Sequence, residues 1–242
     1  MRFSIITITF NAEEFLEKTL ASVATQDFSD YEHIIWDGGS VDRTLKIADK
    51  YDVRVYQGKD AGIADAMNKG AAFAEGEILL YLHADDFLAH PSVLSMVDTA
   101  FRQHPSLEWL YGQIYTVDER GEVVAQSKYC PFSYKKLRCY NIISHPSTFV
   151  KRELFERIGG FNPTLRYCMD YDLWLRLARF STPLALHAPL ACFRKHKGSL
   201  STAEPVNVAD EAYRVRNQHV QSLWEHYKSY RTWKKRREKA CS

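Results

Sequence analysis

The chain has 242 residues, long enough for one large α/β domain with a sizeable core and a helical extension. An apolar fraction of 45% and a charged fraction of 26% are those of a soluble globular protein, and no apolar run reaches the roughly 20 residues that a membrane helix needs. The five cysteines form no C-x-x-C pair, which argues against a disulfide framework or zinc site and for reduced thiols in the cytoplasm. Met1 leads directly into a strand pattern, so we expect no signal peptide.

The net charge of +2 is unevenly distributed. Residues 227–242 carry seven basic side chains and one acidic side chain, a net of +6, which leaves −4 on the rest of the chain. The body is therefore mildly acidic, and the basic tail is a distinct element.

In the first ninety residues, strand patterns alternate with helix patterns. The first strand, 3–10, is β-branched and apolar on both faces, as a buried parallel strand should be. We expect further strands at 32–36, 53–57 and 77–82, separated by a helix beginning near Phe15 and by helices at 41–51 and 63–74. Such alternation indicates right-handed crossovers and a mostly parallel sheet.

After Pro91 the predicted elements become shorter. They are a helix at 92–103, strands near 107–116 and 123–127, a short segment of unassigned type at 147–150, helices at 152–158 and 171–180, and one long helix at 209–237. We find no internal repeat, low-complexity segment or interdomain linker. The sequence therefore predicts one domain, with one half for a nucleotide and the other half for something else.

Acidic residues follow three of the predicted strands. Asp37 and Asp60 come after the second and third strands, and Asp85 and Asp86 come after the fourth. In an open α/β sheet, ligands bind in the crevice at the carboxyl ends of the strands. Carboxylates along that edge suit a cation, a ribose or a base, so the pattern predicts a site for a nucleotide that binds together with a metal.

The familiar glycine-rich nucleotide loops are absent. The first strand ends in Thr9, Phe10 and Asn11, without a G-x-G-x-x-G fingerprint, and the chain contains no P-loop. The phosphates then need a metal, and Asp85-Asp86 has the hard oxygens that Mg²⁺ or Mn²⁺ prefers. The alternatives are that this pair caps the next helix or lies in a solvated loop, and that Asp37 only hydrogen-bonds its own turn.

Several segments together resemble the family 2 glycosyltransferases, in the version found in bacterial exopolysaccharide or capsule synthesis. The similarity extends in order over roughly residues 3–201 and is specific as a combination. It is carried by SIITITFNAEEF at 4–15, DGGSVDRT at 37–44, DAGIADAMNKG at 60–70, ADD at 84–86, HPSTFVKRELFERIGGFNP at 145–163, DYDLWLRL at 170–177 and RKHKGSLS at 194–201.

The resemblance implies a GT-A fold, that is, a Rossmann-like, mostly parallel central sheet with helices on both faces, here with a C-terminal helical extension. It implies a glycosyltransferase domain at 1–204, divided into a nucleotide-binding half at 1–90 and an acceptor half at 91–204. The charge and the helix pattern of the remaining residues predict a basic helical tail at 205–242. It also implies a nucleotide-diphosphate sugar donor, Mn²⁺ or Mg²⁺, and inversion at the anomeric carbon.

Roles for donor binding follow from the same resemblance, position by position. Asp85 would contact the ribose, and Asp86 would bind the metal that bridges the diphosphate. His196 is a second metal-ligand candidate, although a lone histidine is as often structural; His83 and His145 are weaker candidates near the site. The remaining residues expected to bind the donor are Thr9, Phe10, Asn11, Asp37, Asp60, Asp65 and Arg194.

Asp170 is the predicted general base. An inverting transfer is one in-line displacement and needs a carboxylate that takes the proton of the acceptor hydroxyl. Asp170 also stands where a helix N-cap would, so both roles are open. Two departures from the family are Met169-Asp170, where relatives have Glu-Asp, and Ala84-Asp85-Asp86, which is not a strict D-x-D.

The chain lacks the Q-x-x-R-W motif and membrane helices of processive synthases, which favours transfer of one sugar to a glycan or polyprenyl-diphosphate-linked acceptor. UDP is favoured by family frequency alone. The tail at 227–242 has aromatic and basic residues that suit an anionic membrane, so we expect a cytoplasmic or peripheral membrane protein that does not bind nucleic acid. Docking of these aromatics on the body is the alternative.

Two other functions remain open at this level. One is a nucleotidyltransferase or another metal-dependent sugar-nucleotide enzyme. The other is a non-catalytic subunit that binds a sugar nucleotide and tethers a partner to the membrane. The oligomeric state, the sugar and the linkage are not encoded in any motif that we recognise.

Overall fold

The computed structural model describes residues 1–199 and 204–241. Within these ranges it contains a nine-stranded sheet in the order β3-β2-β1-β4-β8-β6-β9-β5, with β7 paired to β6 beside this path. The strands are β1 (Phe3–Thr9), β2 (Tyr31–Asp37), β3 (Arg54–Gln57), β4 (Ile78–Tyr81), β5 (Phe87–Leu88), β6 (Trp109–Val117), β7 (Val123–Gln126), β8 (Thr148–Lys151) and β9 (Leu184–Arg194).

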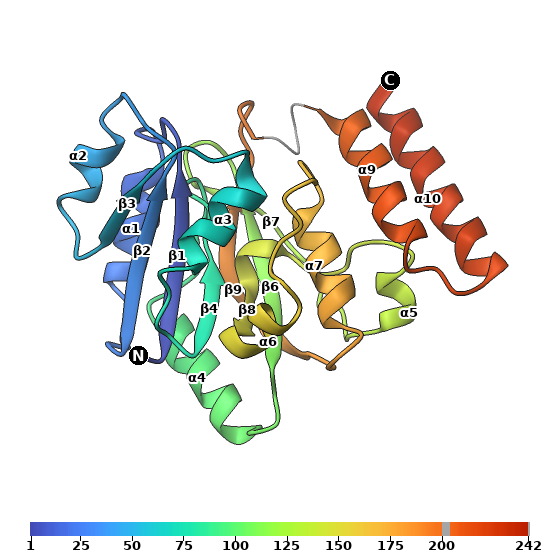
Figure 1. Cartoon of the computed structure of the whole chain (residues 1–242), viewed down its shortest axis with the longest axis horizontal. Helices are drawn as coiled ribbons and strands as arrows, with labels where there is room; N and C mark the ends of the chain where they lie inside the picture. The colour runs from blue at the N-terminus through green and yellow to red at the C-terminus, as the bar shows by residue number, and fades with distance from the viewer. Residues whose placement is uncertain (200–203, 242) are drawn as a thin grey trace.

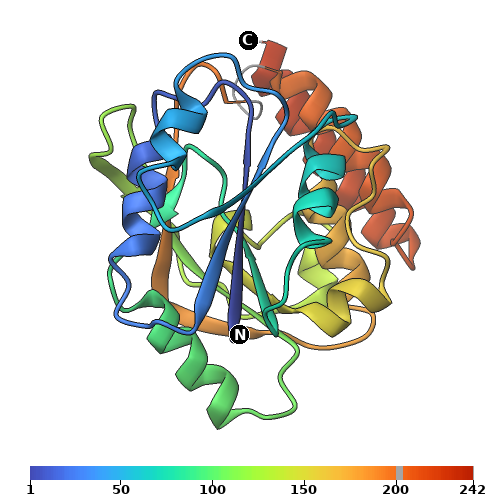
Figure 2. The ribbon, with the colours of Figure 1, turned by 60° about the vertical axis from the view of Figure 1, so that its left-hand side comes forward.

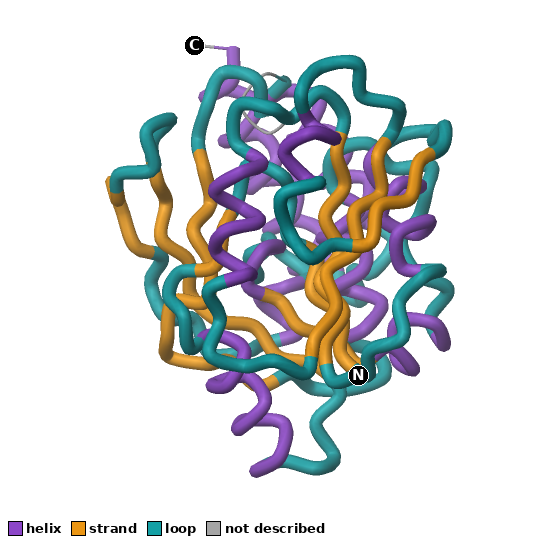
Figure 3. The backbone as a smooth tube through the Cα atoms, turned by 90° about the vertical axis from the view of Figure 1, so that its left-hand side faces the viewer, coloured by secondary structure: helices purple, strands orange, loops and turns teal. Residues whose placement is uncertain are grey.

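The predicted parallel half is confirmed. Strands β1 to β4 are parallel to one another, and Figure 3 shows strands leading from the N-terminus toward loops at the opposite end of the molecule. Strand β8 joins β4 antiparallel, and β6 pairs antiparallel with β8 but parallel with β9. The structure is thus a mixed, mostly parallel sheet that continues through the whole domain.

Strand β9 is an element that the sequence analysis did not predict. Its eleven residues include Pro189, a residue that usually argues against an inner strand. The pairing with β6 shifts register on both sides of Gln113, which is the partner of Pro189. The register shift accommodates the proline. The proline itself is the reason that the sequence did not indicate a strand here.

Helices cover both faces of the sheet (Figures 1 and 2). On β1, Phe3 and Ile5 pack with residues of α1 and α4, whereas Ile6 packs on the other side with residues of α3, α6, α7 and α9. This alternation follows from the two-residue period of a strand. The helices before the C-terminal pair are α1 (Leu16–Ala24), α2 (Thr44–Ala48), α3 (Ile63–Ala71), α4 (Val93–Gln103), α5 (Tyr134–Leu137), α6 (Arg152–Arg157) and α7 (Met169–Leu177), with a 3₁₀ turn at His145–Ser147.

The prediction of one long helix at 209–237 was wrong. The chain forms two helices, α9 (Pro205–Asn217) and α10 (Leu223–Cys241), which lie side by side (Figure 1). A second helix start explains the break, because Ser222 Oγ accepts from the Glu225 amide at 3.2 Å and Glu225 accepts from the Gln221 amide at 2.8 Å. This arrangement is close to a capping box, a motif that is visible in the sequence.

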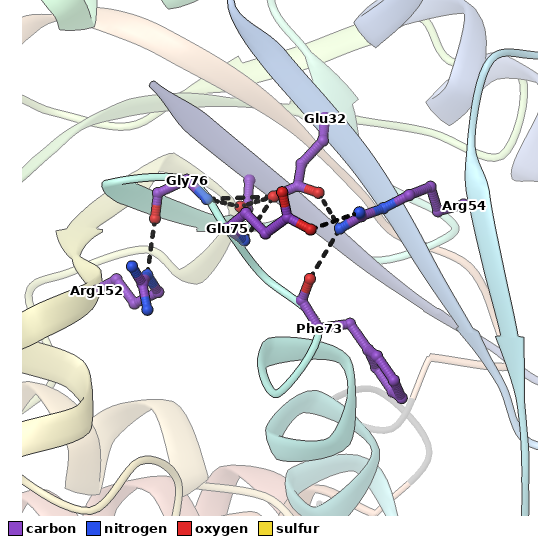
Figure 4. A network of polar contacts seen from close by, with 7 residues as sticks. Glu32, Arg54, Phe73, Glu75, Gly76 and Arg152 are labelled. Atoms are coloured by element: carbon purple, nitrogen blue, oxygen red, sulfur yellow. Dashed lines mark hydrogen bonds and ion pairs between the residues drawn. The ribbon is translucent and has the colours of Figure 1, made fainter. Parts of the chain in front are cut away.

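A polar network fixes the end of the sheet away from the strand carboxyl ends (Figure 4). Buried Glu32 on β2 accepts from Ser4 Oγ at 2.5 Å and from the amide of Glu75 at 2.7 Å, and it pairs with Arg54 of β3. A Cβ on Gly76 would lie 2.5 Å from the backbone of Phe3, so only glycine fits where β4 begins. These contacts lock β1 to β4 in register, which sets where their other ends lie.

Candidate active site

Two cavities lie at the carboxyl ends of the parallel strands. The first has a volume of about 620 Å³ and the second about 470 Å³. They share the wall formed by Ile63, His83, Asp85, His196 and Gly198. Sharing a wall places the contents of one cavity beside the contents of the other, as a two-substrate reaction requires.

The first cavity is built by the end of β1 and the loops beside it. Thr9, Phe10 and Asn11 line it, as the sequence predicts for a nucleotide site, and the Phe10 side chain is 68% exposed. Asn11 has φ of +50°, and its side-chain oxygen accepts from the Val41 amide at 2.9 Å. The hydrogen bond holds this loop in a left-handed conformation that asparagine tolerates better than most residues.

Asp37 is buried beneath the first cavity and is not among the described residues that line either cavity. Its oxygens accept from Thr9 Oγ1 at 2.8 Å, Ser40 Oγ at 2.5 Å and the Ser40 amide at 2.9 Å, with further bonds from Gly39 and Gln57. Burial alone would raise the pKa of Asp37, but the bonds from Ser40 and Thr9 outweigh it and hold the pKa below its ordinary value. In this structure Asp37 therefore organises the loop, and its contact with a nucleotide stays a prediction.

The other two predicted acids of the first half differ in position. Asp60 lines the first cavity and accepts from Trp36 Nε1 at 3.3 Å and from the Gly62 amide at 3.1 Å. Asp65 lies outside the described lining of both cavities and pairs with Lys69 at 2.8 Å, which lowers the pKa of Asp65. The structure brings Asp60, but not Asp65, to the site.

Asp85 and His196 meet at the shared wall although 111 residues separate them. Asp85 Oδ2 lies 2.9 Å from His196 Nε2, with side-chain exposures of 27% and 17%. The ring of His196 packs on Phe15 at 4.8 Å between centroids. The pair is held in place yet open to both cavities.

Asp86 lies deeper than Asp85. It is 1% exposed, lines the second cavity, and its Oδ1 accepts from the Arg194 amide at 3.0 Å. Burial, and secondarily the neighbouring Asp85 carboxylate, raise the pKa of Asp86 well above its ordinary value. An acid held this way favours a nearby cation, because a cation would stabilise its charged form. The alternative helix-cap role is not observed, since the N-cap of α4 is Ser92.

The Arg194 side chain supports the loops around these acids. It is 2% exposed, and its guanidinium donates to the carbonyls of Asp85 at 3.0 Å and Glu119 at 2.7 Å. It also lies over the rings of Phe15 and Phe87. Arg194 is not among the described residues lining the two cavities, so its predicted role at the phosphates remains without a direct contact.

Asp170 lines the second cavity from the first turn of α7. This helix begins at Met169, two residues earlier than predicted, so Asp170 is inside the helix and Cys168 is the N-cap. Its Oδ1 accepts from the Tyr171 amide at 2.6 Å. Burial raises the pKa of Asp170 to about 6, which leaves a carboxylate that is ionised at neutral pH and still basic enough to take a proton.

Two further histidines lie at the site, because His83 lines both cavities and His145 lines the second. The rings of His83 and His145 stack with centroids 4.7 Å apart, and burial lowers the pKa of both, so both are neutral at pH 7. The two ring nitrogens of His145 have no hydrogen-bond partner within residues 1–199 and 204–241. The sequence placed both histidines near the site, and the structure agrees.

Sequence reasoning missed most of the second cavity. Its wall includes residues from several remote segments, which no single motif connects. They are Ile114, Ile143, Ser144, Pro146, Arg166, Tyr167, Met169, Phe193 and Ser199. The available signal was the proximity in sequence of Arg166, Tyr167 and Met169 to Asp170.

The donor atoms at the shared wall suit a hard divalent cation. Asp85 and Asp86 supply carboxylate oxygens and His196 an imidazole nitrogen, but the described residues contain no group of three or more such side chains arranged to enclose a metal. Mg²⁺ and Mn²⁺ commonly take one or two protein carboxylates and complete their coordination with water and phosphate. The residues therefore fit a metal held jointly with a diphosphate.

Solved structures with this architecture define the class. The Staphylococcus aureus TarS fragment 1–349 in complex with UDP-GlcNAc superposes with a TM-score of 0.76 at 20% identity, covering 96% of this chain and 70% of that one. The mannosyltransferase PcManGT of Pyrobaculum calidifontis, in complex with GDP-Man and Mn²⁺, gives a TM-score of 0.66 at 18% identity, covering 99% of this chain and 75% of that one. The fold is GT-A, as predicted.

Sequence comparison gives the family. The profile of Glycosyl transferase family 2 matches residues 4–159, and a PGL/p-HBAD biosynthesis glycosyltransferase of Mycobacterium bovis is 30% identical over 213 residues, covering 83% of this chain and 79% of that protein. The chondroitin synthase of Escherichia coli is 29% identical over 181 residues, covering 72% of this chain and 26% of that protein. The chain belongs to glycosyltransferase family 2 and is a nucleotide-sugar-dependent glycosyltransferase.

Proposed function

We propose that this glycosyltransferase transfers one hexosyl or N-acetylhexosaminyl unit, with inversion, to a hydroxyl of a glycan or polyprenyl-diphosphate-linked acceptor. The observation that carries the proposal is the position of Asp170. This carboxylate, with its pKa raised to about 6, faces a second cavity that shares the Asp85–His196 wall with the first. We assign the donor to the first cavity and the acceptor to the second.

The proposed reaction is a single displacement. Asp170 takes the proton of the acceptor hydroxyl as its oxygen bonds to the anomeric carbon, and the bond from that carbon to the diphosphate oxygen breaks. Approach from the side opposite the leaving group inverts the anomeric centre. The two cavities share lining residues and are therefore adjacent, which supports attack of an acceptor in the second cavity on a donor in the first.

The metal proposal concerns Mn²⁺ or Mg²⁺. Asp86, Asp85 and His196 would hold it, and when bound it supplies Lewis-acid stabilisation of the leaving diphosphate. The presence of Mn²⁺ beside GDP-Man in the PcManGT complex supports this choice. UDP is the proposed nucleotide, supported by the TarS complexes with UDP and UDP-GlcNAc, and the GDP-Man complex of PcManGT makes GDP the main competitor.

We further place the reaction in cell-surface polysaccharide synthesis, next to the cytoplasmic membrane face. No helix in the described ranges is long and apolar enough to cross a bilayer. One side of α10 nevertheless exposes Leu223, Trp224, Tyr227 and Tyr230. Trp233, by contrast, faces α9, where it stacks on Tyr213 and donates to Asp210 at 2.5 Å. The exposed side, with its neighbouring lysines, is the proposed contact with anionic lipid.

A binding and turnover panel tests the function. Nucleotide sugars are compared by thermal shift with and without Mn²⁺, since selective binding stabilises the folded state by about 2.7 kcal/mol at a hundredfold excess over Kd. The same donors are then incubated with glycan and lipid-linked acceptors. Acceptor-dependent release of nucleoside diphosphate is expected. Pyrophosphate exchange without an acceptor would instead indicate a nucleotidyltransferase, and binding without turnover a non-catalytic subunit.

A further inference from the structure

Helices α9 and α10 form a C-terminal hairpin, and a buried glutamate of this hairpin contacts the segment that precedes Asp170. Glu211 lies on α9 and is 4% exposed. Its Oε1 accepts from the Arg166 amide at 3.2 Å, and its Oε2 accepts from the amides of Tyr167 at 2.6 Å and Cys168 at 2.8 Å. One carboxylate thus binds three consecutive backbone N–H groups.

These three bonds tether the segment that leads into α7, as far as its N-cap residue Cys168. The first N–H groups of a helix have no partner inside it, and a negative charge near them is stabilising. The N-cap of α7, Cys168, makes no capping hydrogen bond through its side chain. Glu211 therefore fixes, from 43 residues away, the backbone that enters α7, and it places a negative charge near the N-terminus of this helix.

The segment that Glu211 holds forms part of the second cavity. Arg166, Tyr167, Met169 and Asp170 all line it. Because the amides of three successive residues are fixed, the direction in which α7 starts is fixed as well, and with it the position of the Asp170 carboxylate. The next turns of α9 add apolar support, since Ala212 and Val215 pack in the same core as Met169 and Tyr171.

Glu211 also acts on Asp170 by its charge. Burial is the main reason that the pKa of Asp170 is raised, and Glu211 raises it further. The nearest cation to Glu211 that forms a pair is Arg214, at 3.8 Å and 73% exposed, which screens it weakly. Cys168 lies two residues before Asp170, and its thiol feels the charge of Asp170. The other ionisable groups that line the same cavity are Arg166, Tyr167, His83, Asp85, Asp86, His145 and His196.

We propose that Glu211 is a positioning residue for the general base, so that the C-terminal hairpin completes the active site of the enzyme. This inference rests on the proposed role of Asp170 and adds a residue that lies beyond the part of the chain, 4–159, matched by the family profile.

The test compares Glu211→Gln and Glu211→Ala in the full-length enzyme. Both variants are expected to bind UDP-sugar and Mn²⁺ as the wild type does, while kcat falls, by up to ~10²-fold for the alanine variant because the base is misplaced. Glu211→Gln, which keeps the volume but loses the charge, should also shift the acidic limb of the pH–rate profile to lower pH. A residue needed only for stability would move neither the limb nor kcat at a temperature where the variant is folded.

Asp210→Asn is the matched control, since Asp210 neighbours Glu211 on α9 but bonds Trp233 and Arg237 of α10. It should lower the Tm and leave kcat and the pH profile unchanged. A titration followed by carboxyl ¹³C NMR measures the pKa of Asp170 without any turnover. The pKa of Asp170 should be lower in Glu211→Gln than in the wild type. An unchanged pKa there, or kcat within threefold of wild type, overturns the inference, as does failure of both variants to fold. Absence of sugar transfer by the wild type would instead refute the proposed function.

Discussion

The two cavities are built in different ways. The first is lined mainly by residues 8–15, 60–66 and 83–85, which follow the ends of parallel strands. The second takes its wall from β6, the turn around His145, the start of α7, and the segment after β9. In the first cavity, strand direction brings most of the side chains together, and among the described residues only His196 and Gly198 reach it from a distant segment. In the second, their proximity depends on contacts between parts of the chain that are distant in sequence.

This difference suggests a division of labour that mutations can test. If the first cavity and the shared wall bind the donor while the second carries the chemistry, substitutions should separate affinity from turnover.

The largest effect is expected for Asp170→Asn. Removing the base should reduce turnover by roughly 10²–10⁴ while donor affinity stays the same. Steady-state kinetics and calorimetric titration with UDP-sugar measure the two quantities. Asp172→Asn is the control on the same helix, since its carboxylate pairs with Arg176 and should affect stability rather than rate. Turnover within a few-fold of wild type in Asp170→Asn would place the base elsewhere.

Asp86→Asn should weaken Mn²⁺-dependent donor binding at least tenfold, or about 1.4 kcal/mol, because a charged metal ligand is lost where no glycine loop compensates. Titration of UDP with and without Mn²⁺ measures this. Asp98→Asn removes a buried carboxylate of α4 that pairs with Arg2 and Arg102, and it should leave the affinity unchanged. Equal Mn²⁺ dependence in Asp86→Asn and wild type would contradict the metal assignment.

The pH dependence should follow Asp170. Its pKa of about 6 predicts that kcat/KM falls about tenfold per pH unit below pH 6, since the protonated acid cannot accept a proton.

The raised pKa of Asp170 also makes the stability of the folded state depend on pH. The folded-state pKa lies above the ordinary value of 3.8, so the folded state binds more protons between these values, and stability attributable to Asp170 decreases as pH rises from 3.8 to about 6.

Asp170→Asn should accordingly be no less stable than wild type at pH 8, where the buried wild-type carboxylate is ionised. Thermal unfolding at pH 4 and pH 8 checks this. A markedly lower Tm for the variant at pH 8 would show that the carboxylate stabilises the fold.

The smallest effect concerns the exposed side of α10. Trp224→Ser together with Tyr227→Ser should weaken co-sedimentation with anionic vesicles, and binding by the wild type should decrease steeply with salt. Each basic residue near such a surface contributes ~1 kcal/mol, screened over about 8 Å at physiological salt. Phe180→Ser, which changes another exposed aromatic, is the control. Equal sedimentation of all three proteins at low salt would eliminate the membrane contact.

Deleting 227–242 is a poorer test than substitution. Trp233 bonds Asp210, and Ser229 bonds the buried Arg216, so removal of the tail would expose the inner side of α9. The sequence left open whether the tail aromatics face lipid or the body. In the structure, Trp233 faces the body, and Trp224 and Tyr227 face outward.

Sequence reasoning worked best where function follows chain direction. Asp60, Asp85 and the 9–11 loop could be assigned to the first cavity because each ends a strand of a predictable parallel sheet. Asp65 does not follow the end of a strand. It lies in α3 and forms an ion pair with Lys69. The resemblance to the family supplied His196 and Asp170, which no local pattern would have selected.

The features that the sequence did not predict depend on tertiary contacts, which cannot be recognised from one sequence alone. Glu211 resembles any other acid on an amphipathic helix, and only the return of α9 to the start of α7 gives it a partner. Strand β9 was obscured by Pro189. The break between α9 and α10 was the exception, since Ser222 and Glu225 have the spacing of a helix start.

Strand β5 has a consequence for exchanging parts between related enzymes. Its two residues, Phe87 and Leu88, directly follow Asp86 and pair with Cys192 and Ala191 of β9, at the edge of the sheet farthest from β3. A chimera joined at residue 90 would therefore pair β5, which follows Asp85 and Asp86 of one parent, with β9 of the other parent. The parent that supplies the residues after 90 would have to preserve the β5–β9 pairing as well as the junction. Otherwise the backbone next to Asp85 and Asp86 would lose its support.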